Sequence, residues 1–224
     1  MNTAPCHDGR EAYLEQLFQC QVEILLKTDM PSLAGMNESA FLNLVEPLHE
    51  MIWDIDPLGY SLPFMIVVTS RLVSSIVQCA KIYQGRRGET TLDSQLISTT
   101  RSGSTPRHCY LVTQVDDGRR CGCLTATDFE EHARRQGRTP FNIEEGLALA
   151  RYCPEILGTH DLCVANMRYG READRMIYIG LNEQSVLLEA ERPSEMTSEY
   201  YSFPSFFSRR YITAEPSHPW DGPT

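Results

Sequence analysis

Apolar residues recur with a helical period in the first quarter of the chain. Between residues 10 and 27 the apolar positions are spaced by three or four residues, which predicts an amphipathic helix. A second helix is predicted from Asn37, whose side chain can cap the apolar run at 41–48. Because Pro47 has no backbone N–H, we expect a kink or a new helical start there.

Short runs of apolar and β-branched residues predict strands in the rest of the chain. These runs cover residues 64–69, 109–115, 162–167, 176–181 and 186–189. The first run, FMIVVT, is apolar with little interruption and is typical of a strand that is buried on both faces. Residues 89–107 show little periodicity, so we expect irregular backbone there with one short strand.

Capping signals place helices between these strands. A helix is expected to begin near residues 74–75, and another is expected over residues 127–136. Asn142 followed by Glu145 has the spacing of a capping box, with Asn in place of Ser or Thr. The helix that this box opens is expected to end before Pro154.

The order of these elements predicts the fold class. Helical periods dominate before residue 55 and strand-like runs dominate after residue 160. We therefore expect one α+β or α/β domain over residues 10–192, with N-terminal helices packed on a mixed sheet and antiparallel hairpins from the last three strands. Residues 1–9 are expected to form a flexible leader. Residues 193–224 are rich in aromatic residues and proline, and we expect this tail to pack on the body with a frayed end.

The net charge and the lack of long apolar stretches indicate which partners and which cell compartment to expect. Asp plus Glu number 30 and Lys plus Arg number 20, so the formal charge of the chain is −10. An acidic chain repels phosphate backbones, so nucleic acid is not an expected partner. No apolar stretch is long enough to span a membrane and the N-terminus is polar, so we expect a cytoplasmic protein with no membrane partner. Its eight cysteines are then expected to be reduced.

One group of histidine and cysteine residues is the best candidate in the sequence for a metal site. His108 and Cys109 are followed by Cys121 and Cys123. Neighbouring residues on a strand point to opposite faces, and this spacing does not match that of zinc sites, so buried thiols are the simpler interpretation. The glycine-rich motifs of nucleotide-binding proteins are also missing. We therefore expect neither a metal nor another cofactor.

One continuous segment resembles a known family. The run RTPFNIEEGLAL at 138–149, with Pro154 and Leu157 behind it, resembles an uncharacterised bacterial family that is common in actinomycetes and has no known function. PSLAG at 31–35 and PFMIVV at 63–68 fit the same family in the same order. The resemblance fades after Leu181, and it implies a single bacterial cytoplasmic domain with no established activity.

Polar residues at strand ends and at one helix start are the candidate site residues. Glu144 and Glu145 could serve as paired carboxylates in acid–base catalysis, or they could simply be first-turn acids that complete a helix cap. The candidate substrate-binding residues are Ser70, Arg71, Arg138, Asn166 and Arg168. Alternatively, Ser70 and Arg71 simply form a turn, and Arg138 is a solvated loop arginine.

Two of these arginines lead to a functional hypothesis. If the strands ending at residues 69 and 167 are parallel neighbours, Arg71 and Arg168 emerge at one sheet edge and can bind an anion there. We therefore expect a small anionic metabolite as ligand, and a cofactor-independent cyclase, isomerase or lyase of a specialised biosynthetic pathway. The alternative is a non-catalytic accessory or interaction module, in which the aromatic tail contacts a second copy of the chain or another protein.

Overall fold

The N-terminal helices form one layer of the molecule. The computed structural model describes residues 7–69, 74–79, 81–82, 86–99, 108–121 and 125–212. Its first elements are α1 (His7–Lys27), α2 (Met30–Leu33), α3 (Glu38–Val45) and the 3-10 helix η1 (Glu46–Met51). Asn37 caps α3, since its side-chain oxygen accepts the Ala40 N–H at 2.8 Å. The α-helix ends at Val45 and the tighter η1 follows with Pro47 in its first turn, as expected at proline.

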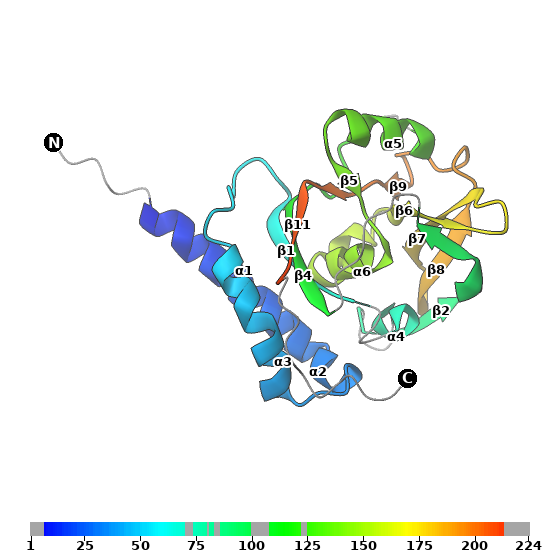
Figure 1. Ribbon diagram of the computed structural model, residues 1–224. Coiled ribbons are helices and arrows are strands. Elements are labelled where there is room, and N and C mark those ends of the chain that lie inside the picture. The colour runs from blue at the N-terminus through cyan, green and yellow to red at the C-terminus, as the bar shows by residue number, and fades with distance from the viewer. Residues whose placement is uncertain are drawn as a thin grey trace.

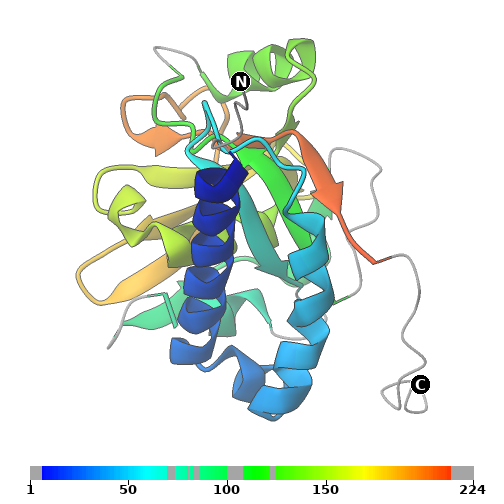
Figure 2. The same ribbon diagram turned by 90° about the vertical axis from the view of Figure 1, so that its left-hand side faces the viewer.

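A first sheet lies against these helices. Strand β1 (Leu62–Val68) pairs antiparallel with β4 (Cys109–Val115), and β4 pairs antiparallel with β11 (Ser208–Arg210). Phe64 and Ile66 pack against the helices, whereas Met65 and Val67 face the opposite side of the sheet. Figure 2 shows α1 and α3 lying across this sheet. The predicted strand at 64–69 is therefore buried on both faces, because each face has its own partner layer.

Helix α6 (Ile143–Tyr152) lies between this sheet and a second one, as Figure 1 shows. Every residue from Glu145 to Arg151 is buried, which is typical of a helix in the core of a protein. A Cβ atom at Gly146 would lie 2.6 Å from Cγ1 of Val164 and 2.9 Å from Cδ1 of Ile179. Glycine at this position therefore lets α6 approach the second sheet closely.

The second sheet is built mainly from hairpins. In order across the sheet, its strands are β2 (Arg87–Thr90), β8 (Ser185–Glu191), β7 (Arg175–Leu181), β6 (Asp161–Tyr169) and β3 (Ile97–Thr99). Strands β6, β7 and β8 pair antiparallel, as predicted, whereas β2 pairs parallel with β8. Val164, Ile179 and Leu188 belong to the core cluster that also contains the apolar residues of α6.

The outer face of the second sheet is covered at one end. Helix α5 (Ala126–Arg135) packs there, and its Phe129 stacks on Phe203 with 5.3 Å between the ring centroids. The remaining described elements are α4 (Ser75–Cys79), η2 (Ser94–Leu96), β5 (Thr139–Pro140), η3 (Pro154–Ile156), β9 (Tyr201–Ser202) and β10 (Ser205–Phe206). Strands β9, β10 and β11 tie the C-terminal segment to β6, β5 and β4 respectively.

The α+β class is confirmed, but one expected strand neighbourhood is wrong. Strand β1 belongs to the first sheet and β6 to the second, so the strand ends near residues 69 and 167 are not parallel neighbours. The partner of β1 is instead the distant run at 109–115, which pairs with it antiparallel. Among the described residues, β3 lies within the region 89–107 that was expected to hold one short strand, and β2 begins before that region. None of the described helices is long and apolar enough to cross a membrane.

The close approach of α6 to the second sheet makes Gly146 a test of the fold. We expect Gly146→Ala to lower the free energy of unfolding by about 1–3 kcal/mol, because the added methyl group overpacks the core. Gly9 of α1 is the matched control, since a Cβ there meets nothing within 4 Å, and Gly9→Ala should stabilise the helix by up to about 1 kcal/mol. Chemical denaturation measures both changes. Equal effects of the two substitutions would contradict the packing described for α6.

Candidate functional site

The predicted capping box is present at the start of α6. Glu145 N–H donates to the side-chain oxygen of Asn142 at 2.9 Å, and Asn142 N–H donates to Oε2 of Glu145 at 2.8 Å. Glu144 stands beside them and is half-buried. The two acids predicted as a catalytic pair thus have different surroundings, and Glu145 also completes the cap.

The second carboxylate oxygen of Glu145 accepts hydrogen bonds from residues of two strands, β4 and β11. Its Oε1 accepts Nε–H of Arg209 at 2.7 Å and the hydroxyl of Tyr110 at 3.1 Å. Arg209 also lies over the ring of Phe206, with 4.9 Å between the guanidinium carbon and the ring centroid. We call Tyr110, Asn142, Glu145 and Arg209 the buried polar cluster. It joins β4, α6 and β11 through charge-assisted hydrogen bonds.

Burial governs the ionisation of this cluster. Desolvation raises the pKa of Glu145, and the neighbouring Arg209 acts in the opposite direction. Desolvation and the charge of Glu145 both raise the pKa of Tyr110. Glu145 has no exposed surface, and both of its carboxylate oxygens already accept hydrogen bonds. In this arrangement the carboxylate stabilises the junction of three elements.

The other predicted residues are dispersed over the fold. Arg138 donates to the hydroxyl of Ser205 at 2.8 Å and to the carbonyl of Gln114 at 2.7 Å, so it links β10 to β4. Arg168 donates to the carbonyls of Ala165 and Met167 and forms an ion pair with Glu130 of α5. The remaining residues are Asn166, which is buried in β6, and Ser70 and Arg71, which lie outside the described residues.

The cysteines of the described residues are buried or partly buried, apart from Cys20. Cys109 is buried against the N-terminal helices, and desolvation raises its pKa to about 12. Desolvation likewise raises the pKa of Cys121 to about 11, and its thiol lies 3.9 Å from the carbonyl of Phe203. Both are therefore thiols at neutral pH and weak nucleophiles. Among the described residues no group of three metal-ligating side chains forms, and Cys123 lies outside them.

Arg151 is a residue that the sequence analysis missed. It lies in the last turn of α6, is 4% exposed, and donates from Nη2 to Oε1 of Gln78 in α4 at 3.2 Å. Its Nε is buried and has no hydrogen-bond partner. No carboxylate of the described residues forms an ion pair with it, and desolvation lowers its pKa. The spacing of Ile143, Leu147 and Arg151 by four residues is a sequence signal that could have placed this arginine on an apolar stripe.

These features define an α+β protein whose central helix is held between two sheets. On this helix the carboxylate of Glu145 is paired with Arg209, whereas Arg151 forms no ion pair with a described residue. The sequence matches the family model described as a family of unknown function (DUF5701) over residues 24–170, which is more than half of the 224 residues. The chain therefore belongs to this family. Neither the search of curated proteins nor the search of solved structures finds a match.

The buried polar cluster predicts a pH-dependent effect of Arg209→Met. Without the guanidinium, Glu145 is a buried carboxylate with no counter-charge, and we expect a loss of about 3–5 kcal/mol of unfolding free energy at pH 7. The pKa of Glu145 is already raised above its ordinary value of 4.5 and rises further in the variant. The folded variant therefore holds the proton more tightly than the unfolded chain, and its loss of stability grows as the pH rises above 4.5.

Denaturant titrations at pH 5 and pH 7 measure this difference. The double variant Glu145→Gln/Arg209→Met removes both charges and should recover most of the stability lost at pH 7. A pH-independent loss, or a double variant no more stable than Arg209→Met alone, would contradict the pairing of Glu145 with Arg209.

Proposed function

We propose that this protein binds a small anionic metabolite, and that Arg151 recognises its anionic group. The observation that carries the proposal is the buried guanidinium of Arg151, whose Nε has no hydrogen-bond partner. The ligand class is the one expected from the sequence, but the arginine is a different one. Arg138 and Arg168 use their guanidinium donors within the fold, whereas Arg151 retains an unused donor.

Electrostatics supports an anionic ligand at this position. Moving a cation from water into the core costs several kcal/mol unless an opposite charge compensates it. Arg209 has such a partner in Glu145, whereas Arg151 donates to the neutral amide of Gln78. A carboxylate can accept two parallel hydrogen bonds from a guanidinium, so a carboxylate ligand fits an arginine with a free Nε.

The groups around Arg151 favour binding over acid–base catalysis. The titratable side chains whose charges act on Arg151 are Tyr152 and Cys79. Desolvation raises the pKa of Cys79 to about 12, and it raises the pKa of Tyr152 as well. The Tyr152 hydroxyl also donates to the carbonyl of Ile66 at 3.0 Å. Neither group exchanges protons readily near neutral pH, so we propose a binding role in which these side chains position the ligand.

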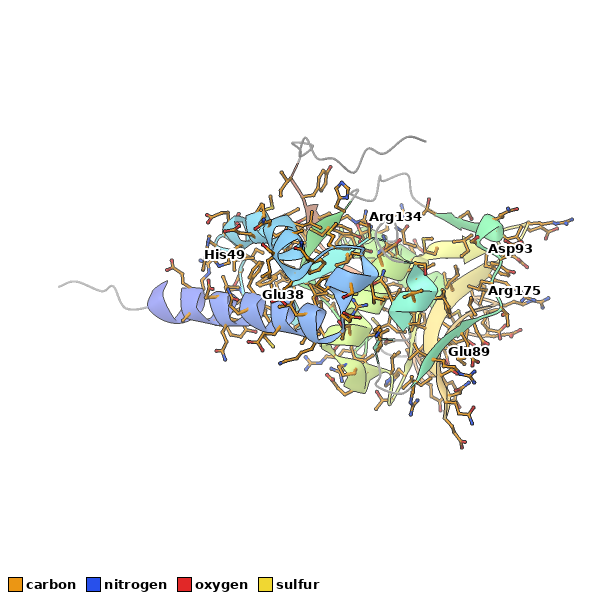
Figure 3. The ribbon with its side chains drawn as sticks, turned by 90° about the horizontal axis from the view of Figure 1, so that it is seen from below. Glu38, His49, Glu89, Asp93, Arg134 and Arg175 are labelled. Atoms are coloured by element: carbon orange, nitrogen blue, oxygen red, sulfur yellow. The ribbon has the colours of Figure 1, made fainter. Side chains whose placement is uncertain are left out.

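The test is ligand-induced thermal stabilisation at fixed ionic strength. Acetate, benzoate, malonate and inorganic phosphate serve as probes for the wild type, for Arg151→Met and for Arg134→Met. Arg134 is the matched control, an exposed arginine of α5 that is labelled in Figure 3. A probe present at 100 times its dissociation constant should stabilise the wild type and the control by about 2.7 kcal/mol, and leave Arg151→Met unchanged.

Equal stabilisation of all three proteins by each probe would contradict the proposal. So would the absence of stabilisation by every probe at concentrations that saturate ordinary carboxylate sites. Both outcomes are distinguishable from misfolding, because the melting transition of each unliganded variant is recorded in the same experiment.

Exposed aromatic residues favour a second candidate function, an interaction module. Tyr200 is 62% exposed, Phe207 is 55% exposed and Tyr211 is 44% exposed, although Phe203 and Phe206 of the same segment are buried. Exposed aromatic side chains are enriched at protein interfaces. If this segment mediates self-association, light scattering should show a dimer that Phe207→Ser converts to a monomer. A wild type that is monomeric at high concentration would exclude self-association through this segment.

A further inference from the structure

The outer face of the second sheet carries two carboxylates and two tyrosines. Asp161 lies in β6, Tyr178 in β7, Glu189 in β8 and Tyr201 in β9, and each of the four is half-buried. The Tyr178 hydroxyl donates to Oε2 of Glu189 at 2.7 Å. The rings of Tyr178 and Tyr201 lie 5.4 Å apart between centroids and at 81° to each other. We call these four residues the acid–tyrosine site.

A glycine makes room at the centre of this site. Gly180 pairs with Leu187 across β7 and β8, two residues from the pair formed by Tyr178 and Glu189. A Cβ atom at position 180 would lie 2.6 Å from Oδ1 of Asp161, so the carboxylate occupies the space that a larger residue would take. Glycine at this position therefore makes room for the Asp161 carboxylate over the backbone of β7.

A cavity adjoins the site. It has a volume of about 420 Å³, and Leu187 and Glu189 line it together with Ile76 and residues 88–91. It is open to solvent, and it borders the acid–tyrosine site at Glu189. Ser185 lies on the same face of β8 as Leu187 and Glu189, since side chains alternate along a strand. Its hydroxyl is buried and has no hydrogen-bond partner among the described residues.

The charges of the site are not neutralised within the described part of the chain. No basic side chain of the described residues forms an ion pair with Asp161 or Glu189. The two carboxylates repel each other. Glu89, labelled in Figure 3, also lines the cavity, but its charge is paired with Arg87, with 3.6 Å between Oε1 and Nη2. A cation would relieve this repulsion, and two tyrosine rings at right angles offer it electron-rich faces.

We infer that the acid–tyrosine site binds a small organic ammonium ion, with its charged group between Asp161 and Glu189 and its apolar body against Leu187 and the tyrosine rings. This site is on the outer face of the sheet, whereas Arg151 lies in the core, so the inference is independent of the proposed anion binding. It also assigns a role to Asp161 and Glu189, which form no ion pair with a described residue.

Ionisation of Asp161 makes the binding pH-dependent. Burial and the charge of Glu189 raise the pKa of Asp161 to about 6. The titratable groups that face it or its neighbours are Cys163 of β6, Tyr178 of β7, Glu189 and Glu191 of β8 and Tyr201 of β9. Because Asp161 carries its negative charge only above its pKa, affinity for a cation should increase as the pH rises from 5 to 7.

An NMR titration with benzylammonium tests the inference, with benzyl alcohol as the neutral probe. Saturable shifts are expected for the amides of Tyr178, Gly180 and Leu187, with benzylammonium and not with benzyl alcohol. The double variant Asp161→Asn/Glu189→Gln should weaken binding at least tenfold. The matched control, Glu11→Gln/Glu38→Gln, removes the same charge from the N-terminal helices, where both residues are exposed, and should bind as the wild type does.

Three results would overturn the inference. Equal loss of binding in both double variants would mean that only the overall negative charge attracts the cation. Equal binding of benzyl alcohol would mean an apolar site, and no saturable shift at pH 7 would mean no site. The spectra of the unliganded variants show whether each one is folded, so a misfolded variant is recognised before titration.

Discussion

The burial of α6 on all sides is the constraint on which the rest of the structure depends. From Glu145 to Arg151 every residue of this helix is buried, so its polar side chains there need partners inside the protein. The capping box satisfies the first turn, and Gly146 allows the second sheet to approach. On the face of the first sheet that points away from α6, Phe64 and Ile66 pack against the N-terminal helices. The layers of the fold are therefore arranged around this one buried helix.

The two buried charged residues of this helix, Glu145 and Arg151, have opposite electrostatic environments. Glu145 meets Arg209, a residue 64 positions later in the chain, and their pairing ties β11 to the core. Arg151, six residues after Glu145 on the same helix, meets the amide of Gln78 and keeps an unpaired Nε. An uncompensated buried charge lowers stability, and this cost is consistent with the binding role that we propose for Arg151.

Local signals in the sequence predicted local structure well. The cap of Asn37, the capping box at Asn142 and the hairpins of β6, β7 and β8 all depend on residues close together in the chain. The expected membership of a family of unknown function is likewise confirmed, over residues 24–170.

Long-range pairings were not predictable in the same way. Nothing in β1 specifies that its partner is β4, and the hypothesis of a shared edge for residues 69 and 167 failed for this reason. Glu145 was recognised as a capping residue, but its partner Arg209 lies in a segment treated as a tail. Arg138 and Arg168 were chosen for their place at loop and strand ends, and their hydrogen bonds to Ser205 and Ala165 depend on the folded chain.

The free energy of unfolding of ligand-free Arg151→Met at pH 7 tests the central claim most directly. Methionine fills a similar space without a charge, so it removes the desolvation cost that the unpaired guanidinium carries. The account predicts that the variant is more stable than the wild type, by about 1–4 kcal/mol, as for other buried charges replaced by apolar residues. A loss of several kcal/mol would contradict it, because such a loss is expected only if Arg151 already has a compensating partner in the folded protein.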